Sequence, residues 1–131
     1  MLCRSRQQGS DKERLVQIVL SIADGLVRQE LKSALESRGH VIRSASNGIE
    51  AMLHIQRQLP DVLVVDLEMP LMGGARTAEE IRNDPRAKGL PIIGIVSHGN
   101  SVPHLLPAFD VVMEMPFGAG ELLAAISKAV N

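Results

Sequence analysis

Apolar runs alternate with helical segments five times along this chain, and that alternation constrains the fold more than any other feature. The apolar runs span residues 15–22, 41–45, 62–65, 91–96 and 111–113. They are rich in Val, Ile and Leu, which is typical of strands buried on both faces of a sheet. Each step between parallel strands needs a crossover, usually a helix. The sequence therefore predicts an α/β domain with a parallel sheet and helices on both faces.

Helices are expected where apolar residues recur three or four positions apart. The expected ranges are 26–38, a helix from a turn at 46–48 to residue 58, 77–83 and 121–130. We expect these helices to bury Val27, Leu31, Ala34 and Leu35 in the first, Ile49, Met52 and Leu53 in the second, and Leu122, Ile126, Ala129 and Val130 in the last. Residues 97–107 contain two prolines, so we expect one short turn there, in place of a full fourth helix.

Composition fits one globular domain and narrows the function. The chain has 131 residues, 45% hydrophobic and 2% aromatic, with a net charge of −1. Few rings and no basic excess argue against direct nucleic-acid binding. No run is long and apolar enough to span a bilayer, and we expect no membrane association. Cys3 is the only cysteine and no signal peptide is recognisable, which favours a cytoplasmic protein.

The first 14 residues lack periodicity and predict a flexible polar tail, and residues 15–131 form the expected domain. In open parallel sheets, ligands bind beyond the carboxyl ends of the strands. Asp66 ends the most apolar strand, and a carboxylate there must be hydrogen-bonded or paired. The structural alternative is that Asp66 only caps the loop of residues 67–74.

Three motifs, in this order and spacing, carry a resemblance to a known family. Residues 60–74 (PDVLVVDLEMPLMGG) resemble the signature around the phosphorylated aspartate of receiver domains in bacterial two-component response regulators. Residues 91–97 (PIIGIVS) are similar to the strand that ends in a phosphoryl-binding Ser or Thr. Residues 115–117 (MPF) resemble the family's Lys-Pro-Phe element. The resemblance covers about 15–131, and it implies a flavodoxin-like, doubly wound five-stranded sheet in the order 2-1-3-4-5.

The resemblance also implies a function in phosphorelay signal transduction and no enzyme activity. Asp66 would accept a phosphoryl group from a histidine kinase or phosphotransfer protein, and Ser97 would bind that group. Mg²⁺ would be held by Asp66, by Asp24 and by the backbone carbonyl of Glu68. An output domain or a second copy of the chain would bind through residues 101–130.

The sequence departs from the family pattern at four positions. A gap-free alignment places Ile22 and Ala23 at the family's acidic pair, with Asp24 one position later. Met115 stands at the position of the family lysine, and it cannot neutralise phosphoryl charge. Val112 occupies the position of an aromatic switch residue in the last strand.

Two functions of different class remain open from the sequence. The first is a phosphorylated switch that uses Asp66. The second is a degenerate receiver that binds a protein partner without phosphorylation, since the loss of charge-stabilising groups slows phosphoryl chemistry by orders of magnitude.

Overall fold

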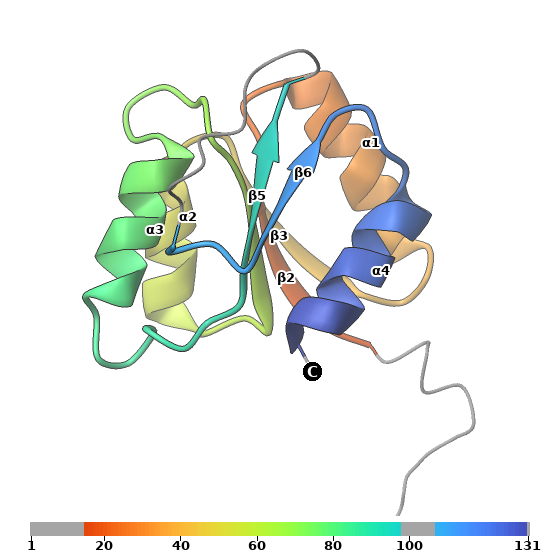
Figure 1. The fold of residues 1–131 in the computed structure, drawn as a ribbon. Coiled ribbons are helices and arrows are strands. Elements are labelled where there is room, and N and C mark those ends of the chain that lie inside the picture. Colours follow the sequence, from red (N-terminus) through yellow and green to blue (C-terminus); the bar gives the residue numbers. More distant parts are fainter. Residues whose placement is uncertain (1–14, 98–106, 131) are drawn as a thin grey trace, which may run out of the picture.

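The sheet positions every candidate residue. The computed structural model describes residues 15–97 and 107–130, which form a single five-stranded sheet with four helices (Figure 1). The strands are β2 (Gln17–Ser21), β3 (Val41–Ala45), β4 (Val62–Asp66), β5 (Ile92–Val96) and β6 (Val111–Glu114). They lie in the order β3-β2-β4-β5-β6, and all four pairings are parallel. This is the predicted flavodoxin-like order 2-1-3-4-5. The predicted polar tail lies outside the described residues, and so do residues 98–106 of the segment 97–107 in which the short turn is expected.

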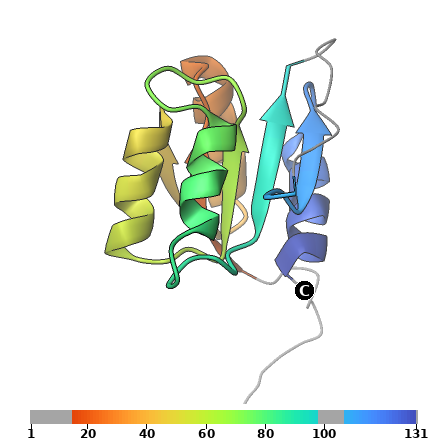
Figure 2. The same ribbon diagram turned by 60° about the vertical axis from the view of Figure 1, so that its left-hand side comes forward.

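Helices cover both faces of the sheet, as predicted. The helices α1 (Gly25–Glu36) and α4 (Ala119–Val130) pack on one face. The helices α2 (Gly48–Arg57) and α3 (Gly74–Arg82) pack on the other face. Figure 2 shows the sheet between these two helical layers.

The alternation of side chains along each strand divides the core into two clusters. In β2, Ile18 and Leu20 point toward α1 and α4, and Val19 points toward α2 and α3. In β4, Val64 and Val65 are divided in the same way. All five side chains are completely buried. A period of two with both faces apolar is what a sheet covered on both sides requires.

Side-chain caps fix where the first two helices begin. Asp24 Oδ1 accepts hydrogen bonds from the backbone N–H groups of Leu26 (2.9 Å) and Val27 (3.1 Å) at the start of α1. Asn47 caps α2 by accepting from the N–H of Glu50 at 2.9 Å. Such caps satisfy donors that have no partner inside the helix.

Three helix predictions were wrong in detail. We expected α2 to bury Ile49 and Leu53, but these side chains are 48% and 49% exposed. The buried residues of α2 are Gly48, Ala51 and Ile55, so the helix is rotated from the predicted face. Gly48 lies on this buried face, in close contact with the carbonyl of Met72 in the loop before α3. The helix α3 begins at residue 74, three residues before the predicted start, and α4 begins at 119, two residues before.

The segment that leads into β6 is fixed by one arginine and one ring. The guanidinium of Arg82 donates hydrogen bonds to the carbonyls of Ala108 and Leu90, and it pairs with Asp110 at 3.2 Å. A Cβ on Gly94 would lie only 2.4 Å from the nearest carbon of the Phe109 ring, so the ring occupies the space that a side chain at this position would need. Gly94 therefore allows residues 107–110 to pack closely on β5.

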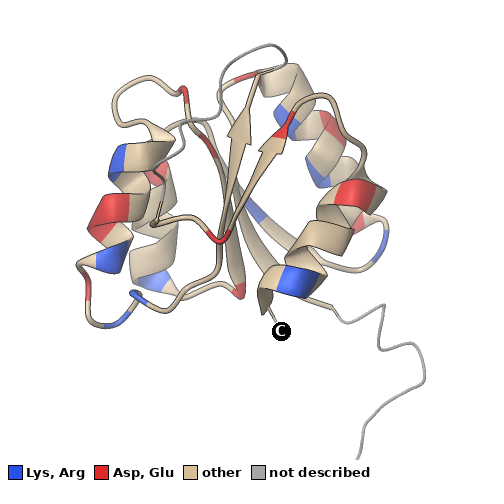
Figure 3. Cartoon of the chain, viewed as in Figure 1, with Lys and Arg blue, Asp and Glu red and all other residues tan. Residues whose placement is uncertain are grey.

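Charged residues lie mainly on the helices. Figure 3 shows acidic and basic positions interspersed along α1 and α3. Four of these form two ion pairs between residues one turn apart, Lys32 with Glu36 and Arg76 with Glu80. None of the described helices is both long enough and apolar enough to cross a membrane.

Replacing Gly48 with alanine tests how tightly α2 is held against the loop before α3. A Cβ at Gly48 would lie 2.4 Å from the carbonyl oxygen of Met72 and 2.3 Å from Thr77 Oγ1. We expect Gly48→Ala to lower the free energy of unfolding by about 1–3 kcal/mol, measured by urea denaturation. Gly120→Ala in α4 is the control, because nothing lies within 4 Å of its Cβ position. Equal stabilities of the two variants would contradict the contact.

Candidate functional site

The carboxyl ends of four strands and the first turn of α1 enclose a pocket of about 210 Å³. It lies at the edge of the sheet where β2, β4, β5 and β6 end, as the switch-point rule predicts. The pocket is lined by Ile22, Asp24, Val27, Asp66, Ile95, Ser97 and Met115. The structure therefore brings together both carboxylates and the serine that the sequence singled out.

Asp66 is half-buried at the end of β4, and two main-chain donors hold its carboxylate. The N–H of Glu68 donates to Oδ1 at 3.1 Å, and the N–H of Ala23 donates to Oδ2 at 3.4 Å. The first bond is the local turn that the structural alternative predicted. The second crosses from β4 to the end of β2, and a loop cap does not require it. Asp66 is thus both a loop residue and part of the pocket.

The electrostatic surroundings favour the neutral form of Asp66. Partial burial raises the pKa of Asp66 above the ordinary value of an aspartate, and it is the largest cause of the shift. The hydrogen bonds from Glu68 and Ala23 lower this pKa, and the negative charges of Glu68 and Asp24 raise it. Burial is thus the main reason that the ionised form of Asp66 is disfavoured, and the charges of Glu68 and Asp24 add to the effect.

The remaining predicted positions divide into two groups. Ile22 and Met115 line the pocket with Asp66, so the family's missing acidic and basic groups leave apolar walls. Val112 and Glu68 are absent from the lining. Val112 lies within β6, away from the strand end, and Glu68 enters the site through its backbone N–H. The structure describes residues 107–130 of the predicted 101–130 partner surface.

Sequence reasoning missed the contribution of Arg28. This residue is the fourth of α1, and its Nη1 donates to the backbone carbonyls of Ile22 at 2.6 Å and Ala23 at 3.4 Å. A cation in the first turn of a helix opposes the helix dipole. This unfavourable position in the sequence could have indicated that Arg28 interacts with groups outside its own helix.

The loop between β4 and α3 is fixed by its own main chain. Leu71 has a φ of 69°, which is uncommon for a residue with a side chain, and its side chain is 78% exposed. The carbonyl of Met72 accepts from the N–H of Gly48 at 3.0 Å, and Gly74 N donates to Leu67 O at 3.3 Å. These bonds connect the loop after Asp66 to the start of α2.

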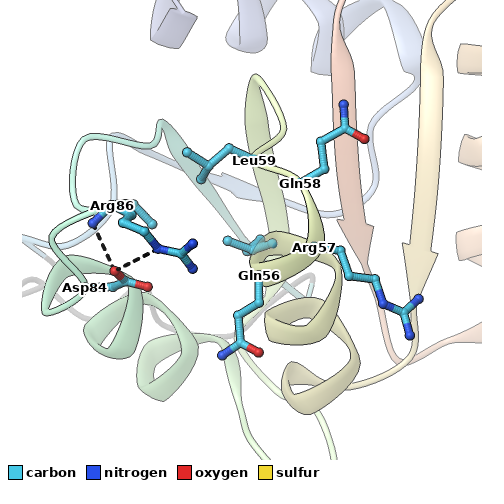
Figure 4. A pocket seen from close by; sticks show the side chains of 8 residues that line it. Gln56, Arg57, Gln58, Leu59, Asp84 and Arg86 are labelled. Carbon is cyan, nitrogen blue, oxygen red and sulfur yellow. Dashed lines mark hydrogen bonds and ion pairs between the residues drawn. The ribbon is translucent and has the colours of Figure 1, made fainter.

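A second hollow, of about 190 Å³, lies at the opposite end of the sheet between the end of α2 and the segment after α3 (Figure 4). Figure 4 shows Arg57 directed away from it and Arg86 directed across it. Arg86 is largely exposed and pairs with Asp84 at 3.9 Å. This hollow gathers no carboxylate pair and no serine, so the chemistry belongs to the pocket at Asp66.

Comparison with known proteins identifies the family. The family model "Response regulator receiver domain" matches residues 21–126. The chain belongs to the response regulator receiver domain family. Among curated relatives, it is 31% identical over 107 residues to response regulator MprA of Mycobacterium leprae. It is 30% identical over 104 residues to the phosphate regulon transcriptional regulatory protein PhoB of Rhizobium meliloti.

These alignments cover 79% and 77% of this chain and 46% of each relative, so the chain spans about half of their length. Two solved structures share the fold. The chemotaxis response regulator CheY4 of Vibrio cholerae matches with a TM-score of 0.78 and 21% identity, over 88% of this chain and 99% of that one. A receiver domain protein of Clostridium thermocellum matches with a TM-score of 0.78 and 24% identity, over 89% and 95%.

Receiver domains bind Mg²⁺ at the acidic pocket, and the donors of this chain can be compared with that need. Mg²⁺ in proteins is commonly held by one or two carboxylates and several waters. Asp24 and Asp66 line the same pocket, and the charge of Asp24 contributes to the raised pKa of Asp66. The described residues contain no group of three or more His, Cys, Asp or Glu that could hold a metal. They fit a water-rich site with two carboxylates.

Replacing Asp66 with asparagine tests the electrostatic description. Because the folded-state pKa of Asp66 is raised, the folded protein binds this proton more tightly than the unfolded chain. The free energy of unfolding therefore falls as pH rises from the unfolded pKa through the folded pKa. We expect Asp66→Asn to be more stable than wild type in urea at neutral pH, with the advantage lost below the ordinary aspartate pKa of about 3.9.

Glu30→Gln, an exposed carboxylate on α1, is the matched control and should change stability little at either pH. A destabilised Asp66→Asn whose deficit does not vary with pH would contradict the account.

Proposed function

We propose that this chain is a phosphoacceptor switch in which Asp66 receives a phosphoryl group from a histidine kinase or a phosphotransfer protein. The observation that carries the proposal is the position of Asp66 at the mouth of a strand-end pocket with Ser97 beside it. Membership of the receiver family supports the same function. The curated relatives are named as response regulators and transcriptional regulatory proteins, and one match is the sensor histidine kinase CheAY of Helicobacter pylori.

The chemical step needs a nucleophile and a leaving group. A carboxylate oxygen of Asp66 attacks the phosphorus of a phosphohistidine. The P–N bond breaks, and the imidazole leaves with the electron pair and takes up a proton. The product is an acyl phosphate on Asp66. Phosphoryl transfer depends mainly on positioning and on neutralising charge on the phosphoryl oxygens.

The described residues provide the positioning. The N–H groups of Ala23 and Glu68 orient the carboxylate of Asp66, and the hydroxyl of Ser97 donates to a phosphoryl oxygen. Asp24, Asp66 and the backbone carbonyl of Glu68 would hold Mg²⁺. When bound, the ion supplies positive charge that offsets the negative phosphoryl oxygens.

The apolar walls set the expected rate. Ile22 and Met115 line the pocket where the family pattern has an acidic group and a lysine. Each missing charge-stabilising group can cost orders of magnitude in rate. The nucleophile and its main-chain donors are present, so we propose slow phosphorylation. The alternative, a module that binds its partner without phosphorylation, becomes the conclusion if Asp66 never reacts.

The partners follow from the same proposal. The domain would act as a cytoplasmic signalling protein without enzyme activity of its own. Its output would be a linked domain or a second copy bound through residues 101–130. The chain spans about half the length of its curated relatives, so a regulatory function like theirs is only proposed for this protein.

Phosphorylation can be tested directly with a small phosphodonor. We expect the protein incubated with acetyl phosphate and Mg²⁺ to gain the mass of one phosphoryl group, as read by intact-protein mass spectrometry. Asp66→Asn should gain none, and Ser97→Ala should react about 10–100-fold more slowly because it lacks one donor to the phosphoryl group.

Asp84→Asn is the control, because Asp84 lies at the other end of the sheet and caps a local turn. It should be phosphorylated at the wild-type rate. Wild type that gains no mass, or Asp66→Asn that gains as much as wild type, would overturn the proposed function.

A further inference from the structure

None of the described residues that line the pocket around Asp66 is a cation. Among the residues that line it, Asp24 and Asp66 are acidic, Ser97 is polar and the other four are apolar. A phosphoryl group on Asp66 would add negative charge to a pocket that already holds two carboxylates. A cationic side chain among the described residues would therefore act on Asp66 from outside this lining, in addition to any bound metal ion.

Arg28 is a cation whose hydrogen bonds reach the backbone at the end of β2. Its guanidinium is partly buried, and Nη1 donates to the carbonyl of Ile22 at 2.6 Å and to that of Ala23 at 3.4 Å. These two positions are those at which the family pattern has its acidic pair. Hydrogen bonds from a charged donor are about twice as strong as neutral ones. The side chain is therefore held at the end of β2 even though it belongs to α1.

One peptide group lies between this cation and the nucleophile. The carbonyl of Ile22 and the N–H of Ala23 belong to the same peptide unit. The carbonyl accepts from Arg28, and the N–H donates to Asp66 Oδ2 at 3.4 Å. Linked hydrogen bonds polarise one another, so a cation on the carbonyl makes the N–H a better donor. A bond of this length in the free protein can shorten when charge develops on its acceptor.

We propose that Arg28 is a positioning residue that acts on Asp66 through the Ile22–Ala23 peptide, supplying positive potential that the apolar lining lacks. The consequence for phosphoryl transfer rests on the proposed function, whereas the hydrogen-bonded chain itself does not. Arg28 touches neither Asp66 nor the phosphoryl group. Its contribution is to fix and polarise the donor that faces Oδ2.

The test compares Arg28→Met with Lys32→Met, which removes another α1 cation, one that pairs with Glu36 one turn along. The first readout is the rate of phosphorylation by acetyl phosphate. We expect Arg28→Met to react roughly tenfold more slowly than wild type. Lys32→Met should keep the wild-type rate, and Arg28→Lys should recover part of the loss because it keeps the charge.

The second readout needs no phosphorylation. In NMR spectra of the free protein, the Ala23 amide proton should move upfield and exchange faster in Arg28→Met, as it should in Asp66→Asn. If both changes act on one chain, the double variant should shift this amide by less than the sum of the two single shifts. Urea denaturation of each variant confirms that the proteins compared are folded.

The outcomes separate the two proposals. The role of Arg28 would be overturned if the Ala23 amide shifts in Asp66→Asn but shifts no more in Arg28→Met than in Lys32→Met. This holds whatever the phosphorylation rates are. If the Ala23 amide shows coupling between Arg28 and Asp66 but the protein never gains a phosphoryl group, the hydrogen-bonded series is supported and the proposed function is overturned. Equal rates for Arg28→Met and wild type, in a protein that is phosphorylated, would limit Arg28 to a structural contact.

Discussion

The hydrogen bond from the Ala23 N–H to Asp66 Oδ2 connects the ends of two strands, and the geometry of the pocket depends on it. It is possible because β2 and β4 are parallel neighbours, with Ser21 beside Val65 in the register. Parallel strands end at one edge of the sheet, so the first residues after each strand meet there. The sequence places an aspartate at the end of the central, fully buried strand, and the sheet then surrounds it with the ends of β2, β5 and β6.

Charge balance at that edge is the feature that distinguishes this chain from the family pattern. Ile22 and Met115 make the pocket more apolar, and partial burial raises the pKa of Asp66. The groups that counter this effect are the main-chain N–H groups of Glu68 and Ala23, and Arg28 donates to the carbonyl of the same peptide unit as the second N–H. A site built in this way retains a nucleophile while it lowers the local positive charge. Under the proposed function, its rate of phosphorylation would depend on how well backbone donors and a bound cation replace the missing side chains.

The parallel sheet was predictable because buried parallel strands have a strong composition signal and their crossovers restrict the topology. The order of its strands followed from the family resemblance. The presence of Asp66, Ser97 and Asp24 in one pocket followed from the rule that parallel strands end at one edge of the sheet. The buried face of α2 was not predictable, since Ile49 and Leu53 have helical spacing and yet lie outward. On the buried face, Gly48 contacts the carbonyl of Met72, a contact between positions far apart in the sequence. The contact of Arg28 with the end of β2 was likewise not predictable from the sequence, because hydrophobic periodicity gives no information on the conformation of a long side chain.

The most direct test of a chemically competent pocket is an NMR titration of labelled protein with Mg²⁺ and then with beryllofluoride, a mimic of the phosphoryl group. The account predicts saturable shifts centred on the amides near Asp24, Asp66 and Ser97, and none of the beryllofluoride shifts in Asp66→Asn. Spectra that remain unchanged at saturating Mg²⁺ and mimic would contradict it, and would mean that the fold has kept its shape without its chemistry.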